Sequence, residues 1–357
     1  MHPIVLQGLS PAALVRATES FVTLPEARKI LGACLREGGV PAVLPGVRRV
    51  ALEAVKARGR WGESQIVAHE KSNEDPFQKL LLQGEDGTRF ETVRIPLEID
   101  GRFTACVSSQ VGCALACAFC ATGRMGLTRN LATWEIVEQV RRVRETLEPG
   151  SRIRGVVFQG MGEPMANLDR VLEAIEVLTE PSLYAIDTRA ITVTTSGLPS
   201  GIRRLAREAP RVRLGVSLSS LKPSVRRTLM PIEDKHPLAE VLAATREHAV
   251  ATGLAPLFAY TLLAGINDDD EHLVALSAAV RAFQDATGKR PTLRLIPYNH
   301  LGDDDPFVRQ SEDAEARVRA RLRELGTASK MRYSGGGDIG AACGQLETSV
   351  RAAVTAP

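Results

Sequence analysis

The chain has 357 residues, of which 44% are hydrophobic and 24% charged, and its formal net charge at pH 7 is +3. This length and apolar content suffice for one large domain and a smaller one. The small positive charge permits an anionic partner but is weaker than the bias typical of nucleic-acid-binding domains. No apolar run reaches the ~18 residues of a membrane span, and Met1–Val5 lacks the pattern of a secretion signal. We therefore expect a cytoplasmic protein without membrane contact.

Residues 1–65 are expected to form a small helical domain. Apolar residues recur at helical spacing in three stretches, residues 9–21, 25–37 and 47–56, which glycines separate. Five basic residues cluster here, and a solvated helix face explains them at least as well as RNA contact does: Arg48, Arg49, Lys56, Arg58 and Arg60. Cys34 lies in the second stretch and is expected to be a buried core thiol.

Residues 66–101 are expected to form a β-hairpin extension that links the helices to the rest of the chain. Residues 78–83 and 90–95 are rich in apolar and β-branched residues. The Gly-Glu-Asp-Gly sequence at 84–87 between them is typical of a tight turn.

Residues 102–347 alternate between strand-like and helix-like runs, and residues 348–357 are left as a tail. The expected strands are 103–108, 154–159, 190–196, 212–218, 257–263 and 292–297, with 330–334 as a possible seventh. The expected helices are 133–147, with Thr133 as its N-cap, 168–178, 200–208, 238–252, 271–287 and 311–325. Successive βα units predict a parallel sheet. Six units are too few for a closed eight-fold barrel, so the predicted fold is α/β, a partial (βα)6 barrel.

Three cysteines lie within eight residues, Cys113, Cys117 and Cys120, in the spacing CxxxCxxC. Zinc sites usually repeat a CxxC pair and take a fourth ligand, which here would have to be distant, such as Cys106 or Cys343. Three thiolates without a fourth ligand suit a 4Fe–4S cluster with one open iron. This spacing is typical of radical S-adenosylmethionine (SAM) enzymes, whose open iron binds SAM.

Small and polar residues follow several of the expected strands. They occupy residues 160–164, 194–197, 217–220 and 297–299. Turn chemistry alone could explain one such loop. Because the ends of parallel strands meet on one rim, four loops together indicate a cofactor pocket there.

The sequence resembles the RlmN/Cfr class of radical SAM RNA methyltransferases over about residues 88–347. The resemblance rests on Cys-Val-Ser-Ser-Gln-Val-Gly-Cys at 106–113, Gly-Met-Gly-Glu-Pro at 160–164 and Leu-Ile-Pro-Tyr-Asn at 295–299. It also rests on Asp-Ile-Gly-Ala-Ala-Cys-Gly-Gln-Leu at 338–346. The first and last of these motifs lie more than two hundred residues apart, which makes the match specific.

The resemblance implies methylation of an adenine ring carbon in rRNA or tRNA with two SAM molecules per turnover. One SAM would methylate Cys343, and the other would yield a 5′-deoxyadenosyl radical that takes hydrogen from this methyl group. The resulting carbon radical would add to adenine. Cys106 would then attack the Cys343 sulfur, releasing the product with a transient disulfide, and Glu91 would accept the ring proton.

The resemblance also implies a ligand set and partners. Cys113, Cys117 and Cys120 would hold the 4Fe–4S cluster. The residues that would contact SAM are Gly162, Glu163, Thr194, Ser217, Leu218, Ser219 and Asn299. The expected partners are a structured RNA with an accessible adenosine and a reductant such as flavodoxin or ferredoxin, and the protein is expected to be a monomer.

Several positions differ from the family pattern and indicate a divergent paralogue. Thr194 and Ser219 stand where serine and histidine are usual, and three aspartates occupy 303–305 in an expected RNA-facing loop. An enzyme of the same mechanism acting on a non-RNA substrate therefore remains an alternative. A zinc-stabilised RNA-binding protein without catalysis is the alternative from another class.

Overall fold

The structure is a computed structural model that describes residues 3–348. All but the first residue of the predicted tail, 348–357, lie outside the described residues. The helices are α1 (Pro11–Ala17), α2 (Leu24–Glu37), α3 (Arg49–Arg58), α4 (Ala121–Arg124), α5 (Thr133–Glu145), α6 (Leu168–Thr179), α7 (Pro199–Glu208), α8 (Pro223–Leu229), α9 (Leu238–Thr252), α10 (Asp270–Thr287) and α11 (Glu312–Glu324). None of these helices is long and apolar enough to cross a lipid bilayer.

Ten strands form one sheet in the order β14-β13-β12-β11-β10-β9-β6-β5-β4-β3. The strands of this sheet are β3 (Gln65–Lys71), β4 (Gln78–Gln83), β5 (Arg89–Pro96), β6 (Arg102–Val107), β9 (Arg152–Phe158), β10 (Ile191–Thr195), β11 (Arg213–Ser217), β12 (Leu257–Leu262), β13 (Thr292–Pro297) and β14 (Ser329–Met331). Neighbours from β6 to β14 pair in parallel, and β3, β4, β5 and β6 pair antiparallel. The predicted partial barrel is confirmed, and β3 is an edge strand that the sequence pattern did not reveal.

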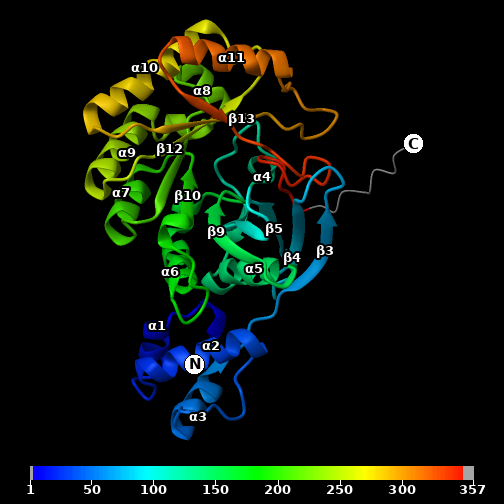
Figure 1. The fold of residues 1–357 in the computed structure, drawn as a ribbon, viewed down its shortest axis with the longest axis vertical. Helices are drawn as coiled ribbons and strands as arrows, with labels where there is room; N and C mark the ends of the chain where they lie inside the picture. The colour runs from blue at the N-terminus through cyan, green and yellow to red at the C-terminus, as the bar shows by residue number, and fades with distance from the viewer. Residues whose placement is uncertain (1–2, 349–357) are drawn as a thin grey trace.

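Two short strand pairs lie outside this sheet. They are β1 (Ile4–Val5) with β2 (Gly59–Arg60), and β7 (Gln110–Gly112) with β8 (Leu127–Asn130). Figure 1 shows the N-terminal helices as a separate group at one end, with α6, α7, α9 and α10 along one side of the curved sheet. The red C-terminal segment lies near α4.

The N-terminal helices bury their own apolar cluster. Ile30 and Cys34 of α2 are fully buried in it, which confirms the prediction for Cys34. Thr23 is the N-cap of this helix, and its backbone N–H donates to Glu26; the C-cap is Gly38, in a left-handed conformation with φ 74°. The boundaries predicted at residues 65 and 101 fall at the starts of β3 and β6, and the division into domains itself stays a prediction.

Most of the basic N-terminal residues are paired with acidic side chains. The pairs are Arg48 with Glu26, Lys56 with Glu53, Arg58 with Glu19 and Arg60 with Glu85. These contacts support the interpretation of the cluster as surface charge.

The predicted N-cap of α5 is wrong. Thr133 is the first helical residue, and its hydroxyl contacts Glu173. Ala132 takes the cap position, where its backbone N–H donates to Glu135 over 2.8 Å. Glu135, the third residue of the helix, therefore accepts the N–H of residue 132. Alanine has no side chain that could accept a backbone N–H of the first turn in return.

Candidate active site

One cavity opens at the C-terminal ends of the parallel strands. It is lined by residues at or just after the C-terminal ends of β9, β10, β11 and β13, by the loop after β7 and by the C-terminal segment. Among the predicted site residues, those that line the cavity are Cys106, Cys113, Cys117, Cys120, Gly162, Glu163, Thr194, Ser217 and Cys343. The structure therefore brings nine of the thirteen predicted residues together.

The loop with the three cysteines is held closed by β7 and β8. At its start, Gly112 has φ 75°, and a Cβ there would lie 1.8 Å from the carbonyl oxygen of Gly126. The N–H of Cys113 donates to the same oxygen over 2.9 Å. A Cβ at Gly123 would lie 2.8 Å from the backbone N and O of Cys117. Only glycine permits these approaches, so the loop is folded tightly around its cysteines.

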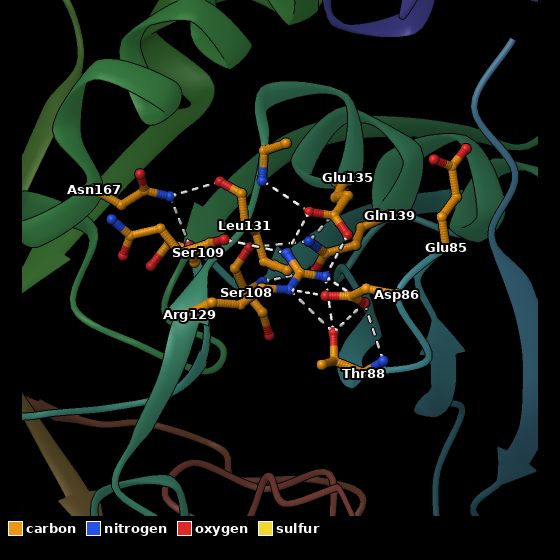
Figure 2. Close-up of polar contacts among 12 residues, drawn as sticks. Glu85, Asp86, Thr88, Ser108, Ser109, Arg129, Leu131, Glu135, Gln139 and Asn167 are labelled. Atoms are coloured by element: carbon orange, nitrogen blue, oxygen red, sulfur yellow. Dashed lines mark hydrogen bonds and ion pairs between the residues drawn. The ribbon is translucent and has the colours of Figure 1, made fainter.

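Arg129 of β8 anchors this loop to two other parts of the fold (Figure 2). Its guanidinium makes a bidentate contact with Glu135 of α5, with both N–O distances 2.7 Å. It also donates to Asp86 and Thr88 in the turn between β4 and β5, over 3.0 and 2.8 Å. This planar fork ties the cysteine loop to the hairpin and the first barrel helix.

The three loop cysteines fit an iron–sulfur cluster. All six cysteines of the chain are among the described residues and are free thiols. Burial raises the pKa of Cys113 and Cys117 to about 12, and a bound metal would favour the thiolate form of both. No three Cys, His, Asp or Glu side chains within residues 3–348 converge on a single metal ion. A cubane cluster does not need such convergence because each thiolate binds a different iron.

Glu163 is buried, and both of its carboxylate oxygens accept backbone hydrogen bonds. Oε2 accepts from Ser196 over 2.8 Å and Oε1 from Met165 over 3.0 Å. Burial raises its pKa. Before it, Gly162 has φ 94°, and a Cβ there would lie 2.5 Å from Cβ of Gln110. The carboxylate is thus fixed at the cavity wall, where it can receive a cationic amino group.

Three predicted SAM contacts do not line the cavity. Leu218 is fully buried in the core, and Ser219 is buried with φ 55°. Asn299 instead supports the C-terminal segment, because its Nδ2 donates to the carbonyl of Cys343 over 3.0 Å and to Ser334 over 2.8 Å. The roles of these residues stay predictions.

The segment with Cys343 is held across the cysteine loop. The N–H of Ala121 donates to the carbonyl of Gly344 over 2.7 Å, and the hydroxyl of Thr122 to that of Leu346 over 2.7 Å. Cys343 is half-buried and Cys106 is buried, and both line the cavity. Burial, then the nearby Cys343, raises the pKa of Cys106 to about 12.

Glu91 lies outside the cavity lining. Its side chain is 1% exposed, with Oε1 3.0 Å from Nζ of Lys79. Oε2 accepts the backbone N–H of Glu347 over 2.8 Å. The backbone of the C-terminal segment therefore occupies one oxygen of this carboxylate.

The acidic loop is less exposed than its sequence suggests. Asp305 has a fully buried carboxylate that contacts the hydroxyl of Tyr298, accepts from the backbone of Leu301 over 3.0 Å and pairs with Arg124 over 2.8 Å. One of the three aspartates is thus an internal anchor.

Three supporting side chains were not predicted: Lys79, Asp75 and Arg226. Lys79 pairs with Glu91, and Asp75 binds the segment that carries Cys343. Arg226 binds the backbone just after β10 and β11. The only signal for Lys79 in the sequence is a charge directly before the apolar residues 80–82.

Comparisons with known proteins agree with this geometry. Residues 107–276 match the model of the radical SAM superfamily. A probable RNA methyltransferase of Sorangium cellulosum is 56% identical over 348 residues, covering 91% of this chain and 88% of the relative. The dual-specificity RNA methyltransferase RlmN of Syntrophobacter fumaroxidans is 40% identical over 320 residues, covering 89% of each.

A solved structure gives the same result for the whole fold. The crystal structure of a radical SAM methyltransferase from Sphaerobacter thermophilus superposes with a TM-score of 0.84 at 34% identity, covering 97% of this chain and 100% of the other. The chain therefore belongs to the RlmN-like family of radical SAM RNA methyltransferases, enzymes that use a 4Fe–4S cluster and SAM.

Proposed function

We propose that this enzyme methylates an adenine ring carbon in RNA and that Cys343 carries the methyl carbon as a methyl-cysteine, with two SAM molecules used per turnover. The observation that carries the proposal is the placement of Cys343 and Cys106 in one cavity with the three cluster cysteines. A ring carbon bearing hydrogen is not a nucleophile, so direct methyl displacement cannot modify it. A carrier thiol beside a radical-generating site overcomes this limit.

Separate residues of the chain bind the cluster and SAM. When bound, the cluster and SAM supply the methyl group and the one-electron chemistry. Cys113, Cys117 and Cys120 hold the cluster, and Glu163 receives the amino group of SAM. Thr194 and Ser217 line the SAM pocket.

The two other cysteines and Glu91 act on the RNA side. Glu91 takes the ring proton. Cys106 attacks the Cys343 sulfur and forms a disulfide, while the bond from this sulfur to the transferred carbon breaks and its electron pair passes to the product. Because the backbone of Glu347 covers Glu91, the C-terminal segment has to shift before this carboxylate reaches the ring.

The substrate is proposed to be RNA whose target adenosine leaves the base stack. An enzyme that acts on a ring atom inside folded RNA must draw the base into its pocket. The buried Asp305 weakens the case for a non-RNA substrate, and membership of the family leaves the non-catalytic zinc alternative without support. A flavodoxin or ferredoxin as reductant, a monomeric state and a cytoplasmic location stay predictions.

Mass spectrometry of the Cys343 peptide tests the proposal. In protein isolated with its cluster, we expect a methyl group on Cys343, and we expect the Cys106→Ala variant to retain RNA covalently. Cys34→Ala is the matched control, because this thiol is buried away from the cavity. Unmodified Cys343 in cluster-loaded protein supplied with SAM would overturn the proposal.

A further inference from the structure

A row of side chains crosses four strands from the cavity to the edge of the sheet. Cys106 of β6 is registered with Val93 of β5, Val93 with Lys79 of β4, and Lys79 with Glu70 of β3. Residues directly opposite each other in a sheet point to the same face. Cys106 and Val93 line the cavity, so Lys79 and Glu70 continue the face on which the cavity lies.

Glu91 joins this row from the same face, because it lies two residues before Val93 on β5. Nζ of Lys79 is 3.0 Å from Oε1 of Glu91 and 2.9 Å from Oε2 of Glu70. The side chains of Lys79 and Glu91 are each 1% exposed, whereas that of Glu70 is 23% exposed. One buried ammonium group thus holds two carboxylates, one beside the cavity and one near the solvent.

The carboxylate of Glu70 makes it easier for Glu91 to take up a proton. In a simple buried ion pair, protonating the carboxylate would leave the lysine as an uncompensated buried charge, which is strongly unfavourable. With Glu70 present, Lys79 keeps an anionic partner when Glu91 takes up a proton. Glu91 can therefore change its charge without leaving a buried cation unpaired.

We propose that Lys79 and Glu70 are positioning residues that hold Glu91 as a carboxylate ready to accept the proton of the substrate ring. This inference rests on the proposed function. In the step concerned, the ring C–H bond breaks, its electron pair stays in the ring, and the proton forms an O–H bond on Glu91. Lys79 and Glu70 keep their charges throughout.

Lys79 and Glu70 have opposite effects on the pKa of Glu91. Burial raises its pKa to about 7, Lys79 from β4 lowers the pKa, and Glu70 from β3 raises it. From the C-terminal segment Glu91 receives the backbone N–H of Glu347, and from β6 the same face carries Cys106. Removing the lysine charge should raise the pKa of Glu91, and removing the Glu70 charge should lower it.

The test is the pH profile of a single turnover with RNA, using holoenzyme already methylated on Cys343. The rate should fall on the acid side as Glu91 becomes protonated. In Lys79→Met we expect this acid limb to move to higher pH by about 1 to 3 units. In Glu70→Gln we expect a smaller shift to lower pH, and Lys79→Arg should restore most of the original profile.

Lys71→Met is the matched control, because Lys71 lies exposed on β3 next to Glu70. Its profile should not move. Unchanged profiles in Lys79→Met and Glu70→Gln, or shifts in the same direction, would overturn the inference. Glu70→Gln alters a partly exposed group and so gives a result even if Lys79→Met does not fold.

The methylation state of Cys343 separates this inference from the proposed function. We expect it to be normal in all these variants, because no ring proton moves when Cys343 is methylated. Absence of methyl-cysteine from the unaltered enzyme would refute the proposed function itself.

Discussion

Arg226 of α8 lies outside the cavity lining and fixes two strand ends that border it. Its side chain is fully buried, with Nε donating to the carbonyl of Leu218 over 3.2 Å and Nη2 to that of Ser196 over 2.9 Å. Its other nitrogen pairs with Glu233. The N–H of Ser196 in turn donates to Glu163. One guanidinium therefore supports the backbone that orients the expected amino-group acceptor.

Replacing Arg226 by methionine should be strongly destabilising. The change leaves Glu233 as a buried carboxylate without its cation, and we expect a loss of about 3–5 kcal/mol in the free energy of unfolding. Arg227→Met is the control, since its pair with Asp234 is exposed to solvent and contributes little to stability. Urea unfolding of the cluster-loaded protein measures both. Equal losses in the two variants would contradict this account.

Among single residues, those that act together within one short stretch of sequence could be predicted. The spacing of Cys113, Cys117 and Cys120 is enough to indicate a cluster, because three thiols in one loop have few other uses. Lys79 and Arg226 could not be assigned in this way. The partners of Lys79 come from neighbouring strands, and Arg226 contacts three different segments, at Leu218, Ser196 and Glu233. Strand register and loop path cannot be read from a local sequence pattern.

Among the elements, the turn between β3 and β4 is hydrogen-bonded to residues 333–338, which lead to Cys343. Asp75 accepts from the hydroxyl of Tyr333 and from the N–H of Gly336, both over 2.9 Å. The N–H of Asn73 donates to Asp338 over 2.9 Å. These contacts join the hairpin extension to the segment that carries the proposed methyl carrier.

Breaking the hydrogen bonds between this turn and residues 333–338 should expose Cys343. In Asp75→Ala, the loss of a charged acceptor worth about 1.5 kcal/mol should raise the open population about tenfold. We expect alkylation of unmethylated Cys343, in protein whose cluster has been reconstituted in the absence of SAM, to become faster by about this factor, as followed by peptide mass mapping. Glu74→Ala is the control, because its exposed side chain has no part in these contacts. An unchanged alkylation rate in Asp75→Ala would show that other contacts hold the segment.

The elements themselves were largely predictable. The βα units of the barrel follow from apolar periodicity, and the hairpin follows from its turn residues. The strands β7 and β8 were not expected, because three or four residues around a cysteine loop carry no periodic signal. Their pairing is set by the contact of Gly112 with Gly126, which becomes visible only in three dimensions.

At the scale of the whole molecule, the N-terminal helices and the barrel meet at Trp134 of α5. A Cβ at Gly8 would lie 2.9 Å from the backbone N of Trp134. Beside it, the side-chain amide of Gln7 exchanges two hydrogen bonds with the backbone of Gly62, over 2.6 and 2.7 Å. The cavity-lining residues all follow residue 76, so the helices do not contribute to the cavity.

A substitution at this junction should therefore separate RNA recognition from cofactor chemistry. An RNA fold is far larger than the cavity, and phosphate contacts outside it fix the position of the target base. In Gly8→Val, the displaced helices should lower the rate of RNA methylation about tenfold, equivalent to about 1.4 kcal/mol. Methylation of Cys343 in the absence of RNA should stay unchanged. Gly39→Val is the control, because a Cβ at Gly39 meets no atom within 4 Å. Parallel loss of both reactions in Gly8→Val would mean that the helices act by stabilising the barrel, and retention of both would mean that RNA binding depends on the barrel alone.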